Sequence, residues 1–264
     1  MKTIVIANQK GGVGKTTTAV NLAASLAAAH RRVLLVDVDP QANATTNSGV
    51  NKTQGIEGSC GALLNQNPEK QIIKTQGHGY DLMPSGPSLI AAESELRQEE
   101  DNEKFLLKSL EQRKANYDYC IIDSPPALNL LTINGLRAAT DLLVPMQCEY
   151  FALEGLAGLI GTVEDLNNAT GHNLKISGII RTMYDGRNKL SQQVVEELIT
   201  HFSEELYSTI IPRNIKLAEA PSFGKPILQY DPSAKGSLAY LALAGEFISK
   251  METLDTNNNT KKNA

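Results

Sequence analysis

The sequence predicts an α/β protein with one domain, in which helices cover both faces of a doubly wound, mostly parallel sheet. Short β-branched apolar runs alternate along the chain with longer segments of helical periodicity. A glycine-rich turn separates the first strand from the first helix, and a second apolar strand follows that helix. Two parallel strands need a crossover connection, so this strand–helix–strand order favours a parallel sheet.

The first three elements lie close together in the sequence. The run T-I-V-I-A at 3–7 is short, apolar and β-branched, as expected of a buried strand. Apolar residues within 15–29 recur at helical spacing. The run R-V-L-L-V-D-V-D at 32–39 is a second buried strand, and it ends in two aspartates.

The remaining elements continue this alternation. Further strands are expected at 71–75, 80–84, 118–123, 141–145, 176–183 and 207–212. Helical periodicity predicts helices at about 88–114, 129–139, 153–168, 190–203 and 236–253. No internal repeat or linker divides the chain, so residues 1–254 are expected to form one domain. Residues 255–264 are polar apart from the final alanine, and we expect them to form a disordered tail.

The composition excludes several classes of protein. The chain has 264 residues, of which 41% are hydrophobic and 20% charged, enough for a core and unlike a disordered or collagen-like chain. No apolar run approaches the ~20 residues of a transmembrane helix. The apolar stretch at the N-terminus is too short for a signal peptide. The three cysteines, Cys60, Cys120 and Cys148, show no C-x-x-C spacing. We therefore expect a soluble, cytoplasmic protein without a disulfide framework.

The strongest functional motif is Q-K-G-G-V-G-K-T-T at 9–17, between the first strand and the first helix. Its glycines let the backbone approach a phosphate, and the loop N–H groups and the positive helix end attract the anion. Lys15 supplies charge for the β- and γ-phosphates, and the Thr16 hydroxyl is placed to ligate Mg²⁺. An ordinary glycine-rich turn is the alternative, and the strand–turn–helix context argues against it. The phosphate-binding residues expected from this loop are Gly11, Gly12, Val13, Gly14, Lys15, Thr16 and Thr17.

This loop departs from the common G-x-x-x-x-G-K-[ST] pattern, because Gln9 replaces the first glycine and Lys10 precedes the glycine pair. Four later blocks accompany it, at 36–45 (V-D-V-D-P-Q-A-N-A-T), 117–126 (Y-D-Y-C-I-I-D-S-P-P), 145–155 (P-M-Q-C-E-Y-F-A-L-E-G) and 211–227 (I-P-R-N-I-K-L-A-E-A-P-S-F-G-K-P-I). In these blocks the chain resembles the ParA/MinD group of ATPases with a deviant Walker-A loop, and within it the small Soj-like ParA partition ATPases. Many members have glycine where this chain has Ala42. The resemblance implies a P-loop NTPase fold and Mg²⁺-dependent ATP hydrolysis.

Three aspartates at strand ends are candidate catalytic or metal-binding residues. Asp37 and Asp39 end the second strand, at the sheet edge where an α/β fold binds its ligand. The resemblance assigns Asp39 to positioning the attacking water and Asp37 to supporting the metal; capping of the next helix is the alternative for both. Asp123 stands at the Walker-B position, where a carboxylate contacts Mg²⁺ or its water shell, and a turn former is the alternative. The expected metal-binding residues are thus Thr16, Asp37 and Asp123.

By the same resemblance, Lys10 reaches across a nucleotide-sandwich homodimer to the partner's phosphates. It would act like an arginine finger supplied in trans, whereas the sequence alone also allows an ordinary exposed lysine. The expected catalytic residues are then Lys10, Lys15 and Asp39. The resemblance also places Pro212 and Asn214 at the base, although a strand-end turn explains them equally well. No N-K-x-D motif of guanine-binding enzymes is present, which favours ATP.

Any DNA contact has to come from a local basic patch, because the net charge is −4 and the pI is about 5.7. The candidates are Arg187, Lys189, Arg213, Lys216 and Lys225. Arg187 and Lys216 match best the basic residues through which family members bind DNA non-specifically. Such binding would neutralise phosphates rather than recognise bases. Five basic residues in mixed surroundings are also typical of an ordinary surface.

The resemblance implies a cycle on the nucleoid. ATP drives dimerisation and DNA binding, and a ParB-like centromere-binding partner stimulates hydrolysis, which segregates a plasmid or a chromosome. The acidic residues within 93–103 are one candidate docking surface for that partner.

Two other functions are less well supported. A MinD-like membrane ATPase would need a terminal amphipathic helix with basic flanks, but acids interrupt the polar side of 238–254, so we expect no membrane binding. A metabolic or iron–sulfur relative would need a second substrate motif or cysteines in matched loops, and neither is evident.

Overall fold

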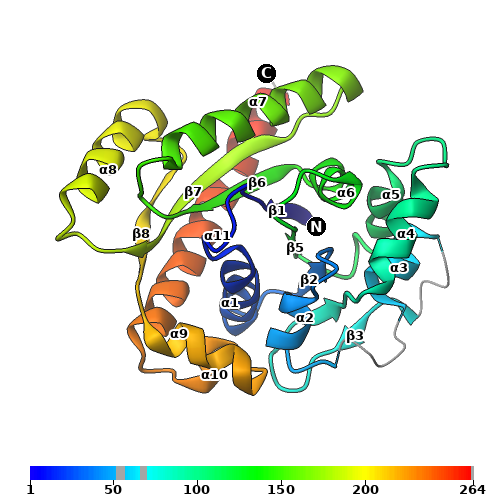
Figure 1. Cartoon of the computed structure of the whole chain (residues 1–264), viewed down its shortest axis with the longest axis horizontal. Helices are drawn as coiled ribbons and strands as arrows, with labels where there is room; N and C mark the ends of the chain where they lie inside the picture. The colour runs from blue at the N-terminus through cyan, green and yellow to red at the C-terminus, as the bar shows by residue number, and fades with distance from the viewer. Residues whose placement is uncertain (52–56, 66–69, 263–264) are drawn as a thin grey trace.

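The computed structural model describes residues 1–51, 57–65 and 70–262, and its centre is an eight-stranded sheet of order β3-β4-β2-β5-β1-β6-β7-β8 (Figure 1). Every pairing in it is parallel except that of β3 with β4. The strands are β1 (Lys2–Ile6), β2 (Val33–Asp37), β3 (Ile73–Lys74), β4 (Asp81–Met83), β5 (Tyr119–Asp123), β6 (Asp141–Met146), β7 (Lys175–Tyr184) and β8 (Leu206–Pro212). The predicted α/β class, with a mostly parallel sheet, is confirmed.

Helices cover both faces of the sheet. In chain order they are α1 (Lys15–Ala28), α2 (Asn43–Asn47), α3 (Gly58–Leu63), α4 (Ser88–Leu96), α5 (Phe105–Glu111), α6 (Leu130–Ala138), α7 (Ala152–Thr170), α8 (Lys189–Phe202), α9 (Ile215–Glu219), α10 (Ile227–Tyr230) and α11 (Lys235–Lys262), with a 3-10 turn, η2 (Ala220–Phe223), after α9. One core joins the sheet to α1 and α11, and the other joins it to α4, α5, α6, α7 and α8. Neighbouring strand residues alternate between these cores: Ile4 and Ile6 belong to the first and Val5 to the second.

The predicted helix at 88–114 is wrong as a single element. Two helices, α4 and α5, occupy the segment, and turns at 97–104 separate them. Asp101 has a φ of 56°, and its carboxylate pairs with Lys104 Nζ at 2.7 Å. The run of acids between the two helices offers no apolar face to bury, so local turns replace the helix there.

The last helix extends further than the sequence indicates. Helix α11 continues to Lys262, beyond the boundary expected at 254. Elongating an established helix costs much less than nucleating one, so the packed first half of α11 can carry polar residues beyond it. Within the described residues, none of the helices combines the length and apolarity that crossing a bilayer requires.

Strand β8 forms one edge of the sheet, and its pairing with β7 is irregular. Arg181 Nη2 donates to the carbonyls of Tyr207 and Ser208, at 2.9 and 3.1 Å. Glu246 of α11 accepts the N–H groups of Ser208 and Thr209, at 2.7 and 2.9 Å. Two charged side chains therefore satisfy the backbone where the ladder is interrupted.

Candidate functional site

Parallel pairing brings the predicted site residues to one edge of the sheet. Ile6 lies beside Asp123 in the register of β1 and β5, and Asp37 lies beside Asp123 in that of β2 and β5. The glycine-rich loop leaves β1 at this edge and leads into α1. This carboxyl edge, where the strand order reverses around β1, is where open α/β sheets bind ligands.

The loop conformation depends on glycine at its end. Gly14 caps α1 in the left-handed region, with a φ of 91°, and gives the helix no side-chain cap. The N–H groups of the first turn of α1 are consequently available to an anion. Thr182 of β7 donates its hydroxyl to the carbonyl of Val13 at 2.7 Å, which ties the loop to the sheet. No motif in the sequence indicates this anchor.

Lys15 is buried at the loop, with its ammonium group 3.0 Å from the carbonyl of Lys10. Burial lowers the pKa of Lys15, and the charges of Asp123 and Asp39 oppose that shift. A cavity of about 370 Å³ lies in front of it, between the loop, Asp39 and the turn after β5. The lining includes Gly11, Gly12, Gly14, Lys15, Thr16 and Thr17, which were predicted to bind phosphate.

Asp123 is fully buried at the end of β5. Its Oδ2 accepts the hydroxyl of Thr16 at 2.8 Å, whereas its Oδ1 has no hydrogen-bond partner within the described chain. Burial, and then the charge of Asp37, raise the pKa of this carboxyl. A buried carboxylate oxygen without a partner beside a threonine hydroxyl suits a hard cation such as Mg²⁺, which prefers oxygen ligands. The residues present therefore fit the predicted metal.

The two aspartates after β2 occupy different surroundings. Asp37 Oδ2 accepts the backbone N–H and the hydroxyl of Thr45, both at 2.8 Å, and its Oδ1 accepts the N–H of Asp39 at 3.1 Å. These bonds hold the loop before α2, so the geometry favours the capping alternative for Asp37. Asp39, by contrast, lines the phosphate cavity, and its Oδ1 accepts the N–H of Gln41 at 2.9 Å. Burial raises the pKa of Asp37 to about 7.

A second cavity, of about 320 Å³, adjoins the loop on the side of β7 and β8. Pro212 and Asn214 line it, as predicted for a base-binding region. The Asn214 side chain is engaged, however, because its oxygen accepts the N–H of Leu217 at 3.3 Å and caps α9. Met183 and Tyr240, which the sequence did not suggest, also line the cavity, and Met183 has a φ of 49°. A bulky residue in that region is strained, a feature common at ligand sites.

Lys10 differs from the other loop residues. Its ammonium group pairs with Glu149 at 2.6 Å, and the two side chains are 40% and 47% exposed. Lys10 is absent from the described lining of the phosphate cavity. Glu149 belongs to the 145–155 block, and the exposed aromatic rings of Tyr150 and Phe151 follow it. Lys10 thus lies at the rim of the site rather than at its own chain's phosphate cavity.

Of the candidate DNA-binding residues, Arg187 and Lys216 are absent from the described linings of both nucleotide cavities, whereas Arg213 lines the second one. Arg187, in the loop between β7 and α8, pairs with Asp185 at 2.7 Å. Lys216, in α9, pairs with Glu219 at 2.8 Å. All four side chains are exposed to water, where such pairs are weak and leave the cations available.

Cys120 and Cys148 are buried, and burial raises the pKa of both thiols. Among the described residues, no group of three His, Cys, Asp or Glu side chains is arranged to hold a metal. A magnesium ion would therefore depend on Thr16, Asp123, water and the nucleotide's own phosphates.

Comparison with known structures supports a nucleotide-binding fold. The crystal structure of cobyrinic acid a,c-diamide synthase from Mycobacterium smegmatis, with a bound ATP analogue and magnesium, matches with a TM-score of 0.82, 32% identity and 96% coverage of both chains. The septum site-determining protein MinD from Pyrococcus horikoshii, complexed with Mg-ADP, matches with a TM-score of 0.74, 25% identity, and coverage of 93% of this chain and 95% of that one.

Comparison of sequences gives the family. A family model described as an AAA domain matches residues 1–176. The chromosome partitioning protein ParA of Caulobacter vibrioides is 46% identical over 253 residues, 95% of each chain. The sporulation initiation inhibitor protein Soj of Bacillus subtilis is 48% identical over 246 residues, 93% of this chain and 97% of that protein. With its P-loop, strand-end aspartates and this similarity over nearly its whole length, the chain belongs to the ParA/Soj family of partition ATPases.

Proposed function

We propose that this protein is an ATP-driven DNA-partition switch. ATP and Mg²⁺ bind at the carboxyl edge of the sheet, and ATP joins two subunits into a sandwich dimer. The dimer binds DNA non-specifically on the nucleoid. A ParB-like partner stimulates hydrolysis, which releases the dimer and so moves a plasmid or chromosomal cargo.

The position of Lys10 supports the dimer best. Its ammonium group pairs with a half-exposed carboxylate, Glu149, and Lys10 is not among the described residues that line the phosphate cavity of its own chain. A cation at the rim of one site is well placed to enter the site of a second copy, where it would stabilise the charge of the transferred phosphoryl group. We therefore assign Lys10 to catalysis in trans.

The other residues have roles within one chain. Lys15 and the N–H groups that follow Gly14 bind and orient the phosphates. Asp39, which lines the same cavity, orients the attacking water. Thr16 and Asp123 hold Mg²⁺, which when bound neutralises charge on the β- and γ-phosphates. The cavity beside Pro212 receives the adenine base.

Co-sedimentation with non-specific duplex DNA, with ATP, ADP or no nucleotide, tests this function across a salt series. Binding is expected with ATP alone and should fall steeply with salt, because counterions are released. The charge-reversing variant Arg187→Glu/Lys216→Glu should bind ATP and dimerise, but no longer bind DNA. Asp39→Ala, which should bind ATP without hydrolysing it, is expected to keep the DNA bound.

The matched control is Lys108→Glu/Lys114→Glu on α5 and the turn after it, which makes the same charge change on another element. An ATP-bound dimer that ignores DNA would overturn the proposal. Anionic liposomes would then test the membrane-bound alternative.

A further inference from the structure

A polar cavity of about 370 Å³ lies apart from both nucleotide cavities. Three segments form its wall: the turn after α2, the segment from β3 to His78, and the chain at the end of η2. In Figure 1 the neighbouring elements α2, β3 and α10 lie along the lower edge of the molecule. Segments distant in the sequence thus meet at one surface hollow.

The walls of this hollow are fixed by direct contacts. Gly49 and Gly224 both have positive φ, of 73° and 60°, and a Cβ built on Gly224 would lie 2.6 Å from Gly49 Cα. The two backbones therefore touch with no room for a side chain. His78 is buried beside them, with Nε2 3.1 Å from the Ser48 carbonyl oxygen and Nδ1 2.5 Å from Gln229 Oε1. The cavity is consequently a preformed feature rather than a gap between mobile loops.

The charge of the lining has one sign. Lys74 and Lys225 line the cavity, and no carboxylate is found among its described lining residues. Neither lysine forms an ion pair within the described chain, in contrast to Arg187 and Lys216. Two uncompensated ammonium groups in one hollow favour an anionic ligand.

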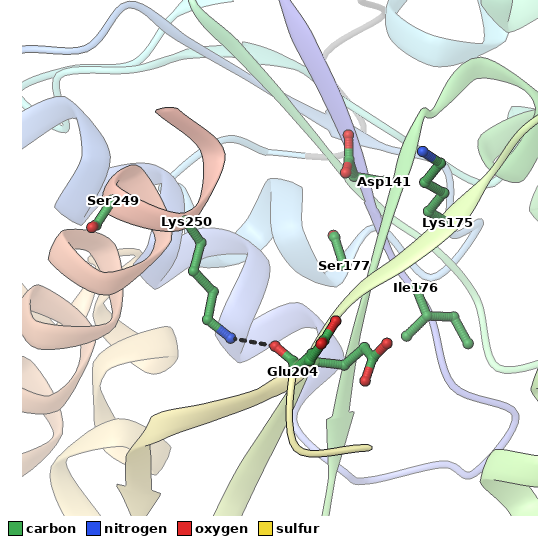
Figure 2. Close-up of a pocket in the computed structure, with 8 residues that line it drawn as sticks. Asp141, Lys175, Ile176, Ser177, Glu204, Ser249 and Lys250 are labelled. Atoms are coloured by element: carbon green, nitrogen blue, oxygen red, sulfur yellow. Dashed lines mark hydrogen bonds between the residues drawn. The ribbon is translucent and has the colours of Figure 1, made fainter. Parts of the chain in front are cut away.

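A larger cavity, of about 470 Å³, has a different charge pattern (Figure 2). It lies where β6 and β7 begin, at the edge of the sheet opposite to the nucleotide site. Its lining mixes two lysines, Lys175 and Lys250, with the acids Asp141, Glu204 and Glu205. Lys250 Nζ is already engaged with the Glu204 carbonyl at 3.0 Å. Lysines without neighbouring acids are therefore not a general feature of the cavities of this protein.

Side-chain contacts connect this polar cavity to Lys216, one of the predicted DNA-binding residues. Phe223, which lines it, is 62% exposed and packs on Tyr230 with ring centroids 5.0 Å apart. Lys216 Nζ lies 5.7 Å from the centroid of the same Tyr230 ring. A row of contacts thus connects Lys216 to the hollow that holds Lys74 and Lys225.

We propose that Lys74 joins Lys225, already a candidate from the sequence, to bind a backbone phosphate of DNA in this cavity, which extends the DNA surface beyond Lys216. The exposed ring of Phe223 forms an apolar wall against the adjoining sugar. This inference rests on the DNA binding proposed above. A free phosphate ion offers the same chemistry, but it would not need the continuous row of contacts from Lys216.

The test compares the wild type and three variants in their ATP-bound state on non-specific duplex DNA across a salt series. In Lys74→Gln/Lys225→Gln, the slope of log K against log salt should become shallower by about 1 for each phosphate that the variant no longer neutralises. The control Lys108→Gln/Lys175→Gln has the same charge change on other surfaces and should keep the wild-type slope. Lys74→Arg/Lys225→Arg retains the charge and should restore binding.

The outcomes separate the two proposals. If the wild type binds DNA with ATP and Lys74→Gln/Lys225→Gln matches the control, the cavity assignment is overturned and the partition switch stands. A wild type that never binds DNA overturns both. A titration of ADP-saturated protein with inorganic phosphate tests whether the cavity binds a free anion. Phosphate binding that needs both lysines, with DNA binding unchanged, would assign the cavity to a free anion instead.

Discussion

At the scale of single residues, the unpartnered oxygen of Asp123 distinguishes it from the other aspartates at the sheet edge. Asp37 uses both carboxylate oxygens to hold backbone and hydroxyl groups of its own chain. Asp123 uses one oxygen for Thr16 and leaves the other without a partner in the described chain. Similar sequence positions at two strand ends therefore have different capacities for a metal.

This difference predicts opposite results for two conservative variants. Asp123→Asn should weaken the Mg²⁺ dependence of ATP binding, because an amide is a poorer magnesium ligand than a carboxylate. Asp37→Asn should leave that dependence unchanged, but lower the free energy of unfolding by about 1–3 kcal/mol, because the amide NH2 cannot accept the N–H of Asp39 while the amide oxygen serves Thr45. Magnesium titrations of nucleotide binding, paired with denaturant unfolding, measure both quantities. A strong decrease of magnesium dependence in Asp37→Asn would return Asp37 to the metal site.

The buried carboxyl of Asp37 also predicts a pH dependence of stability. Its pKa is raised from 3.8 to about 7, chiefly by burial, so the folded chain holds this proton more tightly than the unfolded chain. The contribution to stability is thus complete below about pH 4 and is lost as pH rises through about 7. Nucleotide-free wild type and Asp37→Asn should be unfolded in denaturant from pH 5 to 8. The wild type should lose more stability than the variant across that range; parallel curves would contradict the prediction.

At the scale of elements, sequence patterns predicted the structure best where burial alone decides it. The strands around β1, β2 and β5 are continuous apolar runs, and each formed close to its expected position. The segment at 88–114 was wrong as one helix because its charged middle has no apolar face to bury. The short helices α2, α9 and α10 have four or five residues each, too few to show a helical periodicity in the sequence.

The same limit applies to the site. The loop and the strand-end aspartates were found because their motifs lie within single segments. Thr182 was missed because its role is a contact with Val13, a residue 169 positions away. Ala42 has a φ of 55°, in the left-handed region that favours glycine, and a buried alanine is accommodated there.

The contact between β7 and the loop predicts an effect of removing one hydroxyl. Thr182→Val leaves the Val13 carbonyl without its donor, which costs about 1–3 kcal/mol when the group stays buried. We expect weaker ATP binding together with lower stability, because the loop is no longer anchored. Thr200→Val, which removes a hydroxyl bonded to Glu196 on the exposed side of α8, is the matched control. Calorimetric titration with ATP measures the effect, and equal affinities in both variants would show that the loop needs no anchor.

At the scale of the whole molecule, the sandwich dimer proposed above would require Lys10 to exchange partners. Its pair with Glu149 is about half exposed, and exposed pairs of this kind contribute about 0–1 kcal/mol. Exchange of Glu149 for the phosphates of a nucleotide bound to a second subunit would therefore be inexpensive, which would let ATP control the proposed association.

Lys10→Ala should bind ATP with near wild-type affinity, but fail to dimerise or hydrolyse ATP, because its ammonium group acts on the other subunit. Lys15→Ala should be unable to bind ATP at all, since that ammonium group acts within its own chain. Light scattering with and without ATP, beside nucleotide titrations, separates the two lysines. A Lys10→Ala protein that dimerises normally would remove the role in trans.

The contact between Glu246 and the edge strand β8 has a consequence for biosynthesis. The N–H groups of Ser208 and Thr209 are satisfied by a carboxylate that lies 37 residues beyond Thr209 in the chain. During translation the strand therefore leaves the ribosome well before Glu246 is available to cover it. Until α11 docks, the nascent chain presents an open edge of the kind that recruits strands from other chains. Aggregation through this edge is expected mainly in that interval, and a Glu246 substitution would leave the two N–H groups uncovered even after α11 has docked.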